Sequence, residues 1–157
     1  MIHNDDLLQN AERLRQSFAE QAEAMETARR IPADVSSAMA KAGFYRMFVP
    51  KEFGGLETPP AIASRVFEAL ARGNASCAWV SFIGATSGSA LARIEDTQAR
   101  EIFATPETMI AGVFAPNGKA ERVADGFQVS GRWQWGSGTQ NADWILGGSP
   151  LSVNRQP

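Results

Sequence analysis

A serine between two glycines, Ser137 after Gly136 and before Gly138, is the part of this chain best suited to hold a flat ligand. Glycine has no side chain to cover the backbone, so the hydroxyl and the neighbouring N–H groups are open to close approach by a planar ring. The same three residues are typical of a simple turn between two strands. Residue chemistry alone leaves both interpretations open and favours the turn.

A second segment that offers backbone contacts runs from Phe114 through Ala115 and Pro116 to Asn117, just before Gly118. Ala115 and Pro116 are compact enough for a ligand to approach the main chain, and the Asn117 amide both donates and accepts hydrogen bonds. The segment is equally well interpreted as the end of a strand followed by a Pro-Asn-Gly turn.

Trp79 and Phe82 are the aromatic residues that we expect at a substrate pocket, because a flat aromatic molecule stacks favourably on such rings. They lie in a segment rich in serine, alanine and glycine. Small side chains leave room for a ligand, and they also let helices pack closely. Close packing is the commoner reason for such a segment.

The other reactive residue types predict no catalytic or metal-binding residue. Cys77 is the single cysteine and His3 the single histidine, so the sequence offers no disulfide pair, no zinc ligand set and no histidine to activate the thiol. The carboxylates show no spacing typical of a general acid–base pair. The glycine pairs lack the strand-to-helix setting of a dinucleotide or phosphate loop.

The composition is that of an ordinary globular domain, with 157 residues of which 44% are hydrophobic and 20% charged. A net charge of -2 lacks the basic field that nucleic-acid binding needs, so we expect no nucleic-acid partner. The N-terminus does not read as a signal peptide, and no stretch reaches the roughly 18 apolar residues of a membrane span. We therefore expect a cytoplasmic protein without a membrane partner.

The first hundred residues are predicted to be all-α, because apolar residues recur at steps of three and four. Prolines and small polar residues supply the starts, Asn74 or Ser76 among them, and Gly43 supplies a stop. The apolar connection of residues 44–50 is predicted to pack against the helices. The predicted helices span residues 5–30, 35–42, 60–72, 77–92 and a segment that has Asp96 as its N-cap and ends before Pro106.

After Pro106 the pattern changes to short strands separated by turn residues. The predicted strands span residues 109–114, 126–130, 132–135 and 143–146. Four short strands do not close a sandwich, and an unfinished sheet exposes edges that natural folds cover. We therefore predict an α+β chain: an all-α N-terminal domain over residues 1–106, then the start of an antiparallel β-barrel or β-sandwich domain over residues 107–157. Such a chain is the front part of a longer protein or depends on a partner.

The linker Pro50-Lys51-Glu52-Phe53-Gly54-Gly55 resembles the Pro-x-x-Tyr/Phe-Gly-Gly linker of the acyl-CoA dehydrogenase superfamily. In that superfamily a helical hairpin precedes the linker and a β-domain follows, as predicted here. The resemblance covers the chain up to about residue 148. The C-terminal helical domain, which supplies the catalytic base and much of the tetramer interface, is absent. The resemblance therefore implies a homotetramer when complete, no assignable catalytic residue and a chain that is inactive alone.

Two motifs look closer to one branch of that superfamily. The dehydrogenases place a Thr-Glu-Pro and a Trp-Ile-Thr segment against the flavin, where this chain has Phe114-Ala115-Pro116 and Trp135-Gly136-Ser137. These motifs look more like two-component flavin monooxygenases, which hydroxylate aromatic or polycyclic substrates with reduced flavin from a separate reductase. The alternatives are a dehydrogenase that oxidises an acyl thioester with FAD, and a non-catalytic helical interaction module.

The resemblance implies an FAD or FMN cofactor, supplied as reduced flavin if the protein is a monooxygenase. Ser137 would then contact the flavin near its reactive nitrogen, residues 114–117 would form the other wall of the ring site, and Trp135 would pack beside the ring. The implied cofactor-binding residues are Phe114, Ala115, Pro116, Asn117, Trp135, Gly136, Ser137 and Gly138.

Overall fold

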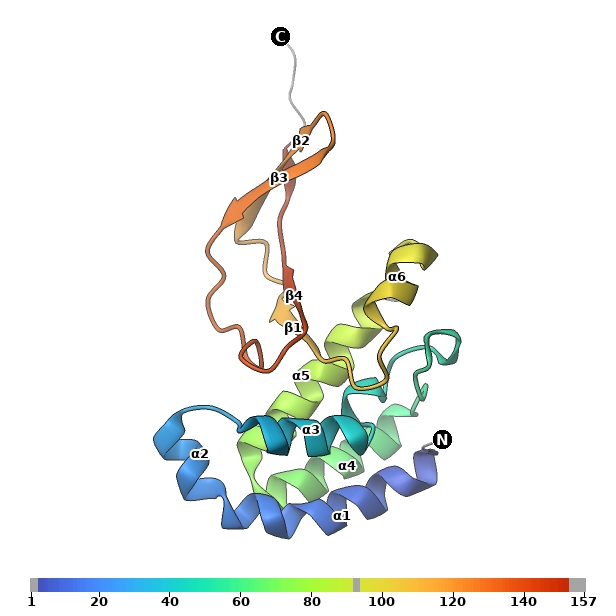
Figure 1. Cartoon of the computed structure of the whole chain (residues 1–157), viewed down its shortest axis with the longest axis vertical. Coiled ribbons are helices and arrows are strands. Elements are labelled where there is room, and N and C mark those ends of the chain that lie inside the picture. Colours follow the sequence, from blue (N-terminus) through green and yellow to red (C-terminus); the bar gives the residue numbers. More distant parts are fainter. Residues whose placement is uncertain (1–2, 92–93, 153–157) are drawn as a thin grey trace.

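The computed structural model describes residues 3–91 and 94–152, as a helical body from which a β region extends (Figure 1). Within these residues no helix has the length and apolar character needed to cross a membrane. The helices are α1 (Asn4–Glu20), α2 (Ala22–Ala28), α3 (Ala33–Lys41), α4 (Pro60–Gly73), α5 (Ala75–Leu91) and α6 (Asp96–Ile102), with short 3-10 helices η1 (Phe44–Arg46) and η2 (Lys51–Phe53) in the linker.

The helix predicted over residues 5–30 is two helices, because the chain leaves the helical conformation at Gln21, where φ is −96° and ψ is 2°. α1 buries Leu7, Ala11 and Phe18 along one face, which is the face that the sequence pattern predicted. α2 then ends at Arg29, whose backbone is left-handed with φ of 52°. The chain turns after Arg29, so that α2 and α3 run in different directions (Figure 1).

α5 is the central helix, packed against α4, η1 and the first strand. Its predicted cap is confirmed: the Oδ1 atom of Asn74 accepts hydrogen bonds from the backbone N–H groups of Ser76 and Cys77, at 2.9 and 3.1 Å. Small residues let η1 approach closely, since a β-carbon on Gly84 would lie 2.5 Å from the ring of Tyr45. The predicted last residue, Ala92, lies outside the described residues.

The predicted linker packing is confirmed, and Arg46 is the residue that organises it. Its side chain is only 4% exposed and lies over the ring of Phe103. Four hydrogen bonds of 2.6–3.1 Å run from its guanidinium to the backbone carbonyl oxygens of Phe53, Phe103, Thr105 and Pro106. Arg46 thus joins the linker to the connection between α6 and the β region. α6 itself begins at Asp96, so its N-cap is Glu95 and not Asp96 as predicted.

The two glycines of the linker motif have different physical roles. Gly54 has φ of 74°, a conformation that glycine adopts without strain and that turns the chain after η2. Gly55 has no room for a side chain, because a β-carbon there would overlap the carbonyl group of Val49. Glycine is therefore required for close packing at position 55 and for the turn at position 54.

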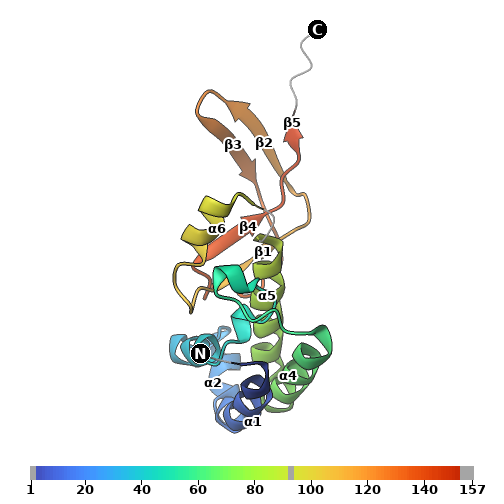
Figure 2. The ribbon, with the colours of Figure 1, turned by 90° about the vertical axis from the view of Figure 1, so that its right-hand side faces the viewer.

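The β region contains five short strands in two sheets, and no barrel is closed among the described residues (Figures 1 and 2). In the first sheet β1 and β4 are parallel, with Ile110 opposite Trp144. In the second sheet the order is β3-β2-β5, with β2 antiparallel to β3 and parallel to β5. The α+β class is thereby confirmed, whereas the predicted antiparallel arrangement holds, among the described strands, for β2 with β3 alone. The strands are β1 (Ile110–Val113), β2 (Gly118–Val123), β3 (Gly126–Gly131), β4 (Trp144–Gly147) and β5 (Leu151–Ser152).

Two details of the strand prediction are wrong. Residues 132–135 form no strand, because the chain leaves the sheet after Gly131 so that Trp133 folds back over it. The indole N–H of Trp133 donates to the carbonyl oxygen of Gly148 at 2.8 Å, and its ring packs where Gly118 and Gly147 have no side chain. The strands β2 and β5 were not predicted: the start of β2 at Gly118 reads as part of a Pro-Asn-Gly turn, and β5 has only two residues, Leu151 and Ser152.

Candidate functional site

A cavity of about 680 Å³ lies between the helical body and the loop of residues 136–141. One wall comes from the end of α2 and the connection to α3, and another from the first turns of α5. The third wall is the loop itself, including Gly136, Ser137 and Gly138. The structure therefore brings the Gly-Ser-Gly segment together with Trp79, which also lines this cavity.

The 136–141 loop is held in one shape by its own hydrogen bonds and by contacts to the helical body. The N–H of Ser137 donates to the carbonyl oxygen of Trp135 at 2.8 Å, and the N–H of Asn141 donates to that of Gly138 at 3.0 Å. The Asn141 side chain donates to the carbonyl oxygen of Ile31 at 3.1 Å, which ties the loop to the α2–α3 connection. Gly138 is left-handed, with φ of 79°, and packs against Met109 and Val80.

Ser137 lies half-buried in this wall. Within residues 3–91 and 94–152 its hydroxyl makes no hydrogen bond. A hydroxyl that lines a cavity without a protein partner is free to donate to, or accept from, a bound molecule. The loop thus fits a planar polar ring, because it offers a free hydroxyl beside backbone that two glycines leave uncovered.

The structure does not bring residues 114–117 into the cavity that Ser137 lines. This segment follows β1 and is supported from the far end of β4: Gly148 donates to Val113 at 2.8 Å, and Gly118 donates to Gly148 at 3.0 Å. The Phe114 side chain is 59% exposed and that of Trp135 is 91% exposed. Both are accessible to a ligand, but neither lines the 680 Å³ cavity.

Trp79 and Phe82, the predicted substrate residues, have different positions. Trp79 lines the cavity and is 53% exposed. Phe82 lies behind it, stacked on the indole with ring centroids 5.5 Å apart, and does not line the cavity. Phe82 in turn packs edge-on against Phe67, which packs against Phe48. A row of aromatic rings therefore connects the cavity wall to the core.

Sequence reasoning missed the charged and polar residues that complete the cavity. Glu26, Arg29 and Arg30 line it from the end of α2, and Asn141 lines it from the loop. More than a hundred positions separate Arg30 from Asn141, so no local pattern connects them. The left-handed backbone at Arg29 is the unusual feature of this group, and it is not visible in the sequence.

Two buried acids lie beneath this region. Burial raises the pKa of Tyr45 to about 12, although a hydrogen bond of 2.9 Å with the hydroxyl of Ser36 lowers this pKa in part. Burial also raises the pKa of the Cys77 thiol to about 12, and its Sγ lies 3.8 Å from Sδ of Met25. Cys77 is therefore protonated and unreactive at neutral pH. Among the described residues no cluster of three or more histidine, cysteine or acidic side chains is arranged to hold a metal ion.

Comparison with known proteins gives a consistent result. Residues 5–101 match the family model of the acyl-CoA dehydrogenase N-terminal domain. The chain is 32% identical over 139 residues to the oxygenase subunit HsaA of a flavin-dependent monooxygenase from Mycobacterium tuberculosis, covering 88% of this chain and 35% of the relative. It is 37% identical over 117 residues to indole-3-acetate monooxygenase from Pseudomonas putida, covering 74% of this chain and 30% of the relative.

The fold is also shared with solved structures. A crystal structure of the HsaA monooxygenase from M. tuberculosis superposes with a TM-score of 0.88 at 30% identity, covering 96% of this chain and 42% of that one. XiaF from Streptomyces, solved in complex with FADH2 and glycerol, superposes with a TM-score of 0.85 at 26% identity, covering 90% of this chain and 36% of that one. The chain thus spans between about a third and two-fifths of the length of these proteins.

Proposed function

Because this chain belongs to the acyl-CoA dehydrogenase family, whose N-terminal domain it carries, we propose that it forms the first part of a flavin-dependent monooxygenase. The complete protein would be the oxygenase component of a two-component system, with reduced flavin supplied by a partner reductase. The names of the relatives support this proposal, since they describe a flavin-dependent monooxygenase, an indole-3-acetate monooxygenase and an FADH2-dependent resorcinol hydroxylase. FAD or FMN, when bound, supplies the oxygen-activating chemistry.

The residues of this chain would bind and orient the flavin ring. The free hydroxyl of Ser137 and the uncovered backbone of Gly136 and Gly138 are proposed to hold the ring edge. Phe114, Ala115, Pro116, Asn117 and Trp135 are proposed as further contacts to the flavin, from a separate and accessible surface. In this proposal the rest of the protein covers the ring site. This chain and the remainder of the protein would then exclude water together.

The substrate is proposed to be a planar aromatic molecule that lies against Trp79. An indole wall half-exposed to a cavity of about 680 Å³ suits a flat apolar ring. We further propose a domain boundary after Pro106, a cytoplasmic location and a homotetramer for the complete protein. Residues 1–2, 92–93 and 153–157 of the two proposed domains lie outside the described residues.

The observation that carries the proposal is that Ser137 and Trp79, which belong to the two proposed domains, line one cavity. It is tested in the complete protein with Ser137→Ala, measuring the dissociation constant of flavin and the product formed per reduced flavin consumed. We expect flavin binding roughly five- to tenfold weaker, the equivalent of about one hydrogen bond, with lower coupling.

Ser130→Ala, at an exposed position of β3, is the matched control and should behave as the wild type. Equal flavin binding and coupling in the Ser137 and Ser130 variants would contradict the role of Ser137. Rapid reduction of the bound oxidised flavin by an acyl-CoA, without any reductase, would instead identify a dehydrogenase.

A further inference from the structure

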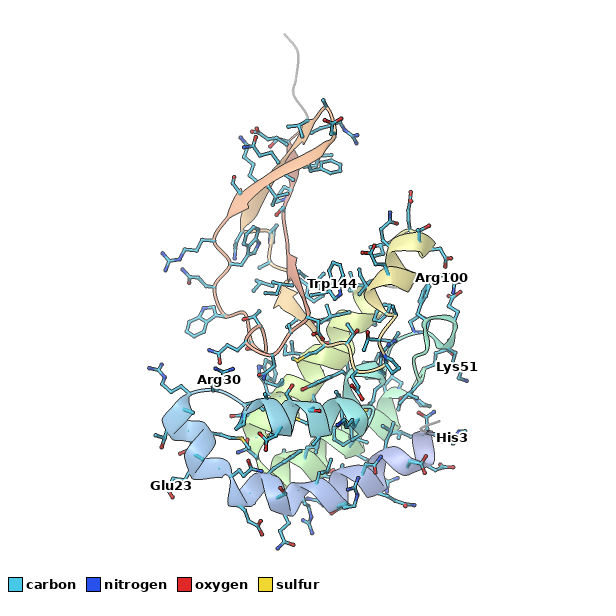
Figure 3. The ribbon with its side chains drawn as sticks, in the orientation of Figure 1. His3, Glu23, Arg30, Lys51, Arg100 and Trp144 are labelled. Atoms are coloured by element: carbon cyan, nitrogen blue, oxygen red, sulfur yellow. The ribbon has the colours of Figure 1, made fainter. Side chains whose placement is uncertain are left out.

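Two adjacent arginines, Arg29 and Arg30, line the 680 Å³ cavity where α2 gives way to the connection with α3. Figure 3 shows Arg30 beside this connection, on the side of the helical body that faces the β region. Both residues are exposed. In the part of the chain that the structure describes, neither forms an ion pair within 4.0 Å. Glu26 is the acidic residue among those that line the cavity, so the charged groups there sum to one positive charge.

The backbone at Arg29 is unusual for a residue with a side chain. Its φ of 52° and ψ of 36° are left-handed, at the helix end where glycine or asparagine is favoured. The N–H groups of Arg29 and Arg30 are both used, donating to the carbonyl oxygens of Glu26 and Met25 at 3.2 and 3.3 Å. Arginine is therefore a strained choice at a position that glycine would fill without strain, which favours a role for its side chain.

This cavity offers two kinds of contact, one for an anionic group and one for a flat apolar ring. A guanidinium group binds a carboxylate or phosphate through two parallel hydrogen bonds, and here two such groups are adjacent. Trp79, on another wall of the same cavity, offers a flat apolar surface. A molecule that satisfies both has a planar ring at one end and an anionic oxygen group at the other.

We propose that Arg29 and Arg30 form an anion-recognition site that selects aromatic substrates carrying a carboxylate. This inference rests on the proposed function, in which the cavity receives an aromatic substrate. A phosphate group of the flavin has the same anionic oxygen chemistry, so the experiment separates the two sources. The Glu26 carboxylate repels a bound anion. Replacing Glu26 should therefore strengthen anion binding, and replacing either arginine should weaken it.

The test uses the complete, flavin-loaded protein and a pair of probes that differ in charge, indole-3-acetate and indole-3-acetamide. Dissociation constants are measured by calorimetry for both probes and for the flavin. We expect the acid to bind more tightly than the amide in the wild type. Arg29→Gly and Arg30→Gln should each weaken the acid roughly five- to tenfold and leave the amide and the flavin unchanged. Glu26→Gln should strengthen binding of the acid severalfold.

Two variants control for structural effects. Arg29→Gly relieves the left-handed backbone, so it should not lower the melting temperature even though it removes the charge. Arg13→Gln, at an exposed site on α1 where the guanidinium bonds to the side chain of Asn10, should leave all three dissociation constants unchanged.

Each other outcome overturns the inference in a different way. Equal losses for acid and amide in the arginine variants would make the effect structural. Weaker flavin binding with an unchanged acid-to-amide ratio would assign the arginines to a flavin phosphate. If the wild type binds both probes equally, this inference fails and the proposed function stands; if it binds neither, the aromatic-substrate part of the proposed function fails as well.

Discussion

Tyr45 and Cys77 are acids that the folded chain holds in their neutral forms. Tyr45 is 2% exposed and Cys77 is fully buried, and burial is the main cause of the raised pKa of each, to about 12. In the unfolded chain the thiol and the phenol ionise near their ordinary values of 9.0 and 10.0. The unfolded state therefore releases these protons at a lower pH than the folded state does.

Alkaline pH should destabilise the protein through these two residues. Their contribution to the free energy of unfolding is complete below pH 9 and is lost as the pH rises from about 9 for Cys77, and from about 10 for Tyr45, towards 12. The part due to Tyr45 reaches about 2–3 kcal/mol. Urea unfolding at pH 8, 10 and 11 measures it.

Tyr45→Phe is the informative variant for this prediction. It removes the phenol and its hydrogen bond to Ser36, which should cost about 1 kcal/mol at pH 8. Between pH 10 and 12, however, its stability should fall less steeply than that of the wild type. Parallel pH curves for the two proteins would show that Tyr45 does not titrate differently in the folded state.

At the scale of elements, α5 depends on close contact with η1. Gly84→Ala places a methyl group about where the Tyr45 ring already lies, since the β-carbon would be 2.5 Å from Cδ1. Alanine is favoured over glycine within a helix by about 1 kcal/mol, but overpacking a core costs about 1–3 kcal/mol. We expect the clash to dominate, with a net loss of stability in urea unfolding.

Ser89→Ala, on the exposed face of the same helix, changes the helical preference without a packing clash, and it removes the hydrogen bond from the Ser89 hydroxyl to the carbonyl oxygen of Thr86. It should raise stability slightly, because alanine is the better helix former. A Gly84→Ala variant that is as stable as the Ser89 variant would mean that η1 moves away from α5 at little cost.

The sequence predicts the helices well because their limits are set by local chemistry. Pro60 begins α4 and the Asn74 side chain caps α5, and both effects act within a few residues. The end of the strand at Gly131 depends instead on Trp133, whose ring covers glycines from other strands. The parallel pairing of β1 with β4 is likewise absent from the alternation pattern, which shows a strand but not its neighbour.

In the candidate site, too, single residues can be predicted from the sequence but their arrangement cannot. Ser137 is recognisable from its flanking glycines, and Trp79 from its aromatic side chain. That they share a cavity with Arg29 and Arg30 follows from tertiary contacts, such as the bond from Asn141 to Ile31, which link distant parts of the sequence. Local reasoning therefore finds candidate residues but cannot assemble them.

On the scale of the whole molecule, the sheet β3-β2-β5 extends away from the helical body (Figure 2). Phe127, Val129 and Leu151 on it are about half exposed, at 54%, 53% and 46%. Apolar strands with open edges promote association. Expressed by itself, the chain of 157 residues should therefore self-associate and bind the dye ANS.

Replacing Phe127 and Val129 with glutamate should reduce both effects, as measured by analytical ultracentrifugation and dye fluorescence. Gln128→Glu adds charge to the same strand without removing apolar surface and is the matched control. Monomeric behaviour of the unmodified chain at micromolar concentration would show that these side chains do not drive association.

The parallel pairing of β1 with β4 also imposes an order on folding during synthesis. The backbone N–H of Met109, next to β1, donates to the side chain of Asp143, 34 residues later, so this part of the fold forms only after residue 143 has been made. As the polypeptide leaves the ribosome, the helical body is complete before β4 has been made. β1 therefore has no strand partner until β4 has been made, and the pairing of the two strands follows the folding of the helical body.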